Sequence, residues 1–60
     1  MSLPNDPYML LSVINTRLRD FYRSLEECCR AEDAEPDAVK EKLLKVGYTY
    51  SPERNQFIPG

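Results

Sequence analysis

The chain has 60 residues, with ten acidic side chains, eight basic ones and no histidine, so its net charge is −2. A chain of this length has material for one small core, and we expect residues 1–60 to form a single domain. Zinc sites need several cysteine or histidine ligands at separated positions, whereas the two cysteines here, Cys28 and Cys29, are adjacent. We therefore expect no metal and no cofactor, and two reduced, buried thiols.

The sequence also predicts where the protein resides. No apolar stretch approaches the roughly 20 residues that a membrane-spanning helix needs. The first residues, MSLPNDPYMLL, lack the basic start and the long apolar run of a signal peptide. We expect a cytoplasmic protein that does not contact a membrane.

Charge is distributed unevenly along the chain. Residues 24–37 hold six acidic side chains and a single basic one, Arg30, between ends that are mildly basic. Affinity for nucleic acid depends on a basic surface, so this acidic middle disfavours nucleic-acid binding. It leaves room for a local basic patch elsewhere.

A first helix is predicted over about residues 7–22. Asp6 can cap its free amides, and Pro7 fits the first helical position. Apolar side chains then recur at three- and four-residue intervals and predict one broad buried face: Leu10, Leu11, Ile14, Leu18 and Phe21. Met9 and Val13 flank this face. They either widen the core or form part of a dimer seam, because so small a core favours support from self-association.

A second helix is predicted over about residues 25–31. Ser24 and Glu27 fit a capping box, in which Ser24 caps the helix and Glu27 reaches back to the amide of Ser24. The inward positions are Leu25 with the two cysteines, which makes the thiols small core side chains. A nucleophilic cysteine would need an activating base, and the sequence has no histidine to supply one.

A third helix is predicted over about residues 36–46. Pro36 opens it at its preferred position, and Gly47 is the expected stop. Its core line is expected to be apolar at four positions: Val39, Leu43, Leu44 and Val46.

The remaining residues, about 48–58, predict a short β-hairpin. Two β-favouring stretches flank Ser51-Pro52-Glu53-Arg54, which resembles a type I turn. A four-residue loop at this place would set Tyr48 opposite Phe57 and Thr49 opposite Gln56. The hairpin must pack on the helices, since an isolated pair of strands is marginal in water.

Three segments of the chain resemble one family: LPNDPYMLLSVINTRLRDFY, SLEECC and LLKVGYTYSPERNQF. The resemblance is to small bacterial proteins of about this length that are catalogued as a domain of unknown function. It covers nearly the whole chain, and NDPYMLLS with GY-x-Y-x-x-x-x-NQF carries most of it. The resemblance implies a bacterial origin and a compact cytoplasmic unit, and it supplies no activity or catalytic residues.

The predicted fold is mainly α, a three-helix, helix-turn-helix-like bundle with a short C-terminal β-hairpin. Three functions compete on this fold. The first is a non-enzymatic interaction module that forms a homodimer or binds a protein partner, with Met9 and Val13 as candidate self-association residues. The alternative is winged-helix-like nucleic-acid binding through the third helix and the hairpin, with candidate contacts Lys42, Lys45 and Arg54.

An enzyme is the third hypothesis, and we do not favour it. The chain has no histidine, no glycine-rich phosphate loop and no serine-centred nucleophile motif. Its carboxylates are placed as helix caps and solvated faces, and their spacing matches no calcium loop. No catalytic residue is predicted.

Overall fold

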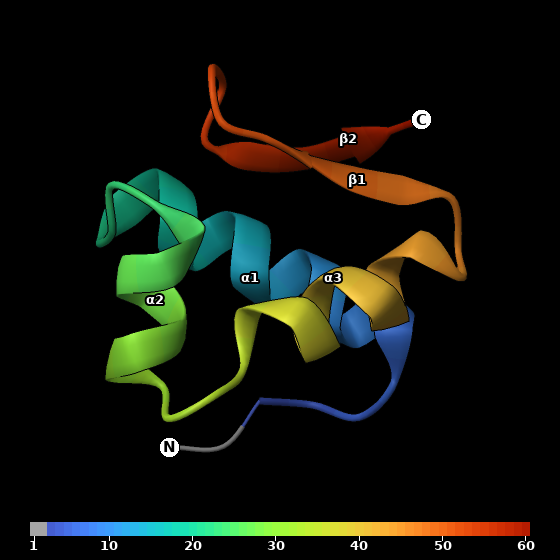
Figure 1. Ribbon diagram of the computed structural model, residues 1–60, viewed down its shortest axis with the longest axis horizontal. Coiled ribbons are helices and arrows are strands. Elements are labelled where there is room, and N and C mark those ends of the chain that lie inside the picture. The colour runs from blue at the N-terminus through green and yellow to red at the C-terminus, as the bar shows by residue number, and fades with distance from the viewer. Residues whose placement is uncertain (1–2) are drawn as a thin grey trace.

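The computed structural model describes residues 3–60. Within them, three helices precede a two-stranded antiparallel hairpin, as the sequence predicts (Figure 1). The elements are α1 (Pro7–Asp20), α2 (Leu25–Ala31), α3 (Pro36–Leu44), β1 (Tyr48–Ser51) and β2 (Gln56–Pro59). The fold is therefore mainly α with a short hairpin. None of the helices described is long and apolar enough to cross a membrane.

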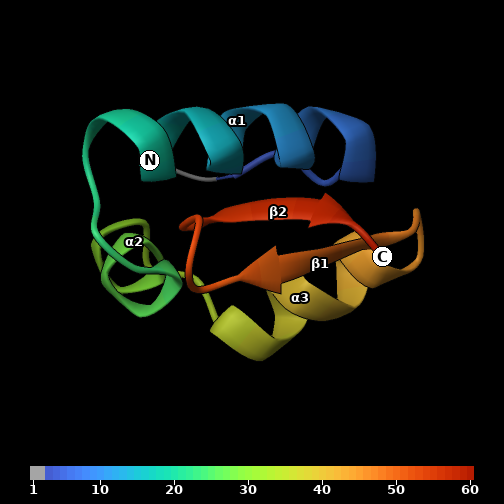
Figure 2. The ribbon, with the colours of Figure 1, turned by 90° about the horizontal axis from the view of Figure 1, so that it is seen from above.

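The hairpin covers one side of the helices. Figure 1 shows it above α1 and α3, while the segment before α1 runs along the opposite side. Figure 2 shows β2 beside α1 and β1 over α3, so the hairpin bridges these two helices. This bridging supplies the support that an isolated pair of strands lacks.

The core lies between the three helices and the inner face of the hairpin. Its side chains are at most 5% exposed: Leu10, Ile14, Leu18, Leu25, Cys28, Cys29, Val39, Leu43 and Phe57. They recur at the helical spacings that predicted them, and Phe57 closes the core from β2. The predicted burial of both cysteines is confirmed.

Side-chain caps begin the first two helices. The Asp6 carboxylate accepts hydrogen bonds from the amides of Tyr8 and Met9, which confirms its predicted role. Ser24 accepts from the amide of Glu27, also as predicted. The second half of that capping box is displaced by one residue. The Glu27 carboxylate accepts from the amide of Arg23 at 2.9 Å, where the amide of Ser24 was expected.

The first helix ends at Asp20, two residues earlier than predicted. Phe21 leaves the helical conformation, with φ −126°, and the amides of Phe21 and Tyr22 both bond to the carbonyl of Arg17. The expected burial of Phe21 is therefore wrong, since its side chain is 70% exposed. The helical spacing places it on the core face only if the helix continues, and here the chain turns away.

The third helix ends at Leu44, also two residues earlier than predicted. The amides of Val46 and Gly47 bond to carbonyls three residues back, a tight turn in which Gly47 takes φ +85°. Glycine as the stop is confirmed, because this left-handed conformation strains other residues. The expected burial of Leu44 is wrong, since 57% of its side chain is exposed.

The hairpin register differs from the predicted one by two residues. Tyr50 faces Phe57 and Ser51 faces Gln56, where Tyr48 and Thr49 were expected. The loop between the strands therefore runs from Pro52 to Asn55, and Asn55 takes a left-handed φ of 52°. A shift of two residues keeps every side chain on its predicted face, so Phe57 still points into the core.

Candidate functional site

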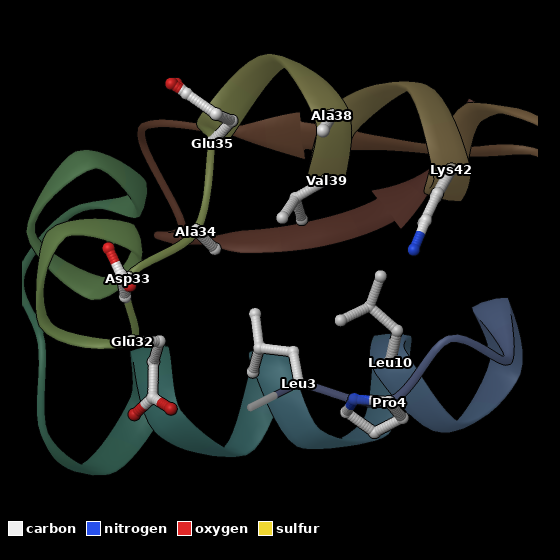
Figure 3. Close-up of a pocket in the computed structure, with 10 residues that line it drawn as sticks. All are labelled: Leu3, Pro4, Leu10, Glu32, Asp33, Ala34, Glu35, Ala38, Val39 and Lys42. Carbon is white, nitrogen blue, oxygen red and sulfur yellow. The ribbon is translucent and has the colours of Figure 1, made fainter. Parts of the chain in front are cut away.

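A pocket of about 370 Å³ opens on the side of the helices opposite the hairpin (Figure 3). It lies between α1, α3, the connection from α2 to α3 and the segment that precedes α1. Its walls combine apolar and charged side chains: Leu3, Pro4, Leu10, Glu32, Asp33, Ala34, Glu35, Ala38, Val39 and Lys42. The charged groups at its two ends, Glu32 and Lys42, bond to other parts of the chain.

Glu32 is the buried charge at one end of this pocket. Its residue is 7% exposed, and Figure 3 shows its carboxylate directed toward α1. There Oε2 lies 3.2 Å from a guanidinium nitrogen of Arg17 and accepts a hydrogen bond from the Tyr22 hydroxyl at 3.4 Å. Burying a carboxylate is costly unless it is paired and hydrogen-bonded. Glu32 therefore joins the α2–α3 connection to α1.

Lys42 stands at the other end of the pocket. Its ammonium donates a hydrogen bond to Oδ1 of Asn5 at 3.3 Å, which fastens the segment before α1 to α3. The pocket thus has apolar walls between two groups that already hold the chain together.

The two thiols are buried in the core and unbonded to each other. Burial, followed by the nearby charges of Cys29 and Glu32, raises the pKa of the Cys28 thiol to about 11. Burial also raises the pKa of Cys29, with Glu26 and Glu35 adding to the effect. Both side chains therefore stay protonated at neutral pH, as inert core cysteines do.

No metal-binding group was found in the part of the chain described. Among residues 3–60, no three histidine, cysteine, aspartate or glutamate side chains gather closely enough to hold an ion.

The candidate self-association residues lie on one side of α1. Met9 is 59% exposed, and Val13, one turn further along, is half-buried. The next positions on the same side are Thr16 and Asp20, which are polar and exposed. The apolar surface here is therefore limited to the first half of the helix.

The three candidate nucleic-acid contacts are exposed but do not form one patch. Lys42 bonds to Asn5, just before α1 begins. Arg54 lies in the hairpin loop beside Asn55, whose side chain bonds to carbonyls at the end of α1. Lys42 and Arg54 thus lie at opposite ends of α1, and Lys45 follows α3 at the same end as Lys42.

One polar contact that the sequence did not predict joins α1 to β2. The side chain of Asn15 accepts a hydrogen bond from the amide of Phe57 at 2.8 Å and donates one to its carbonyl at 3.1 Å. The signal for this contact was an asparagine within the apolar run of α1. Only the tertiary arrangement shows which backbone groups it meets.

A second unpredicted contact fastens the hairpin loop to the end of α1. The Asn55 side chain donates to the carbonyls of Leu18 and Tyr22 at 3.1 and 2.9 Å. It accepts from the Tyr50 hydroxyl at 2.6 Å, and that hydroxyl in turn accepts from the amide of Leu25 at the start of α2. Asn55 thus supplies partners to carbonyls that the end of a helix leaves free.

The fold and these contacts define a small helical unit whose hairpin is locked onto its helices. A family described as a domain of unknown function (DUF4250) matches residues 4–57, and the chain belongs to this family. No curated protein and no solved structure gave a significant match.

The two motifs that carry the family resemblance map onto these structural contacts. NDPYMLLS contains Asn5 and the Asp6 cap, and GY-x-Y-x-x-x-x-NQF contains Gly47, Tyr50 and Asn55 together with the core residue Phe57. These residues begin helices, stop them and fix the hairpin. The residues of these two motifs whose contacts are given above thus stabilise the fold.

Proposed function

We propose that the chain is a non-enzymatic interaction module that associates with a second copy of itself. The observation that supports this most is the amount of apolar side chain left uncovered. Among residues 3–60, four large apolar side chains are each more than half exposed, namely Tyr8, Met9, Phe21 and Leu44. Single exposed apolar residues are ordinary, but so many on a small domain with a thin core favour association.

The polar side chains are bonded to other groups of the fold, which supports a function without catalysis. Asn15 and Asn55 bond to backbone groups, Glu32 is held by Arg17, and the pKa of Cys28 is raised well above neutral pH. A catalytic group needs a pKa matched to its task and a free face toward a substrate. The buried thiols suit the cytoplasm, and we place the module in the bacterial cytoplasm.

The distribution of basic residues supports self-association over nucleic-acid binding. Binding to phosphates needs a continuous basic surface, whereas Lys42 and Arg54 lie at opposite ends of α1. A fluorescence assay with a labelled duplex at about 50 mM salt tests this alternative where phosphate contacts are strongest. We expect no binding.

The experiment that tests the proposed function is sedimentation equilibrium of the purified chain over a range of concentrations. A self-associating module passes from the monomer mass of 7.0 kDa toward twice that mass as concentration rises. A mass that stays at the monomer value into the millimolar range would contradict it.

A further inference from the structure

The two edges of the hairpin differ in how their backbone groups are satisfied. On β2, the outward N–H and C=O groups of Phe57 are both bonded to the side chain of Asn15. The next outward residue on that edge is Pro59, which has no N–H. The β2 edge is therefore closed to a further strand, by means that proteins commonly use.

The open edge of the sheet is that of β1. Residues in an antiparallel ladder alternate between pairs that bond to each other and pairs that point their groups outward. Because Phe57 points its groups outward, its partner Tyr50 does the same, as does Tyr48 two residues earlier. The bond from the amide of Gly60 to the carbonyl of Gly47 fits this alternation. In the part of the chain described, β1 thus presents two amides and two carbonyls that no other group bonds.

An apolar groove of about 290 Å³ runs beside this open edge. It is lined by Lys40, Leu44, Thr49, Tyr50 and Pro52. Figure 2 shows α3 beneath β1, with the strand running back along the helix, so a strand added to β1 would lie over α3. Such a strand would cover Leu44, which is 57% exposed. Hydrogen-bonding groups and uncovered apolar surface thus occur together at this edge.

The two α3 side chains in the groove match the spacing of a strand. Residues one turn apart on a helix, such as Lys40 and Leu44, are separated by about 6 Å along its axis. Alternate residues of a strand are separated by about 6.6 Å and point to the same face of the sheet. Two inward side chains of an added strand would therefore rest on Leu44 and Lys40 at the same time.

The charged side chain in the lining of the groove is that of Lys40. It is exposed, and among the described residues its ammonium has no ion-pair partner. Asp37 and Glu41 lie further round α3 toward solvent and do not line the groove. An acidic side chain in the added strand would thus meet Lys40, and an apolar one would cover Leu44.

The position of α3 argues against a second copy in this place. Antiparallel pairing with another β1 would bring the α3 of that copy beneath the same two strands, where this α3 already lies. Parallel pairing about a twofold axis along the strands would turn the polar outer face of the second β1, with Thr49 and Ser51, onto Leu44. A single extended segment without a helix of its own meets neither obstacle.

We propose that the β1 edge binds an extended segment of another protein, in which an apolar and an acidic residue alternate with polar ones. The segment adds a third strand to the sheet and bonds to the amides and carbonyls of Tyr48 and Tyr50. Its apolar side chain covers Leu44, and its acidic side chain faces Lys40. This inference goes beyond the proposed self-association and does not depend on it.

The probe for the test is an acetylated and amidated heptapeptide, TETLTET, whose sequence reads the same in both directions. Whichever way it binds, it offers its leucine to Leu44 and a glutamate to Lys40. TKTLTKT is the matched control, with the same leucine and threonines and the opposite charge. Heteronuclear NMR at one low protein concentration follows the titration to about 5 mM peptide, because a few hydrogen bonds and one apolar side chain give weak affinity.

We expect TETLTET to shift the amide signals of β1 and the last turn of α3, and to slow hydrogen exchange at Tyr48 and Tyr50. It should bind about fivefold more tightly than TKTLTKT. Lys40→Glu should reverse the order of the two peptides. Lys45→Glu makes the same change of charge outside the groove and should leave the order as it is. Circular dichroism confirms that both variants are folded.

The proposal is overturned if neither peptide shifts any amide, or if the shifts lie away from β1 and α3. It is also overturned if Lys40→Glu and Lys45→Glu give the same order of peptide affinities. Shifts at β1 that follow the concentration of the chain alone would identify a second copy as the occupant and overturn it too. Self-association is measured separately, by sedimentation of the chain without peptide, so either proposal can fail while the other stands.

Discussion

Asn15 and Phe57, 42 positions apart in the sequence, are joined by two hydrogen bonds between one side-chain amide and one backbone residue. The Asn15 amide occupies the outer edge of β2 much as a neighbouring strand would. It fixes the hairpin on α1, and it also leaves β1 as the edge that remains open. One side chain thus connects the position of the hairpin to the stability of the fold.

Replacing Asn15 with alanine is expected to lower the free energy of unfolding by about 2 kcal/mol, because a partly buried amide and carbonyl lose their partners. Urea denaturation measures the change. Thr16→Ala, at the next position on the exposed side of α1, is the control and should shift stability by about 0.5 kcal/mol or less. Equal effects of the two substitutions would contradict the assigned role.

Substitutions at Asn55 separate its conformation from its hydrogen bonds. Asn55→Gly keeps the left-handed φ of 52° and loses the side-chain bonds, whereas Asn55→Ala loses the bonds and strains the backbone as well. We expect alanine to be less stable than glycine by about 1 kcal/mol. Thermal unfolding of the pair checks the order. An alanine variant as stable as the glycine variant would show that the loop conformation differs from the one described.

Stability should fall in alkaline solution because of the cysteines. The pKa of Cys28 is raised to about 11 in the folded chain, mainly by burial, whereas an unfolded thiol titrates near 8.5. Between these values the folded state holds more protons than the unfolded state, so the free energy of unfolding decreases as pH rises. The contribution is intact below about pH 8.5 and is lost toward pH 11.

Urea denaturation at a series of pH values measures this dependence, and Cys28→Ala is the control. The variant should show a shallower decline, while Cys29 and Tyr22, whose pKa values are also raised mainly by burial, keep part of it. Parallel curves for the variant and the wild type would count against the assignment to Cys28.

The ion pair between Arg17 and Glu32 should contribute to stability because its carboxylate is buried. Glu32→Gln keeps the size of the side chain and leaves the guanidinium without this anion, so we expect a loss of about 2 kcal/mol. Glu35→Gln is the matched control, because Glu35 is exposed and should change stability by about 0.5 kcal/mol at most. Chemical denaturation of both variants in parallel gives the comparison.

The sequence predicted the helices and the core well because these depend on local rules. Apolar spacing placed Leu10, Ile14 and Leu43 in the core, and the same spacing placed the two cysteines there. Asp6, Ser24 and Pro36 marked the starts of the three helices. The errors lie where the chain leaves a helix. Phe21 and Leu44 were expected to be buried because the helical period was continued past the true ends of α1 and α3.

The contacts that lock the hairpin could not be predicted because each depends on a partner far along the chain. Asn15 meets Phe57, and Asn55 meets Leu18 and Tyr22, only after the helices have packed. The register of the hairpin was predicted wrongly for the same reason. Asn55 was assigned outside the turn, although its left-handed conformation makes it the last loop residue. The open edge of β1 appears only once this register is known.

The most direct measurement of the proposed self-association is amide hydrogen exchange by NMR at low and high protein concentration. Amides that a second copy covers should exchange more slowly at the higher concentration. The amide of Phe57 is bonded to Asn15 and should be protected at both concentrations. Exchange that is equally fast at both concentrations for every amide would contradict the account.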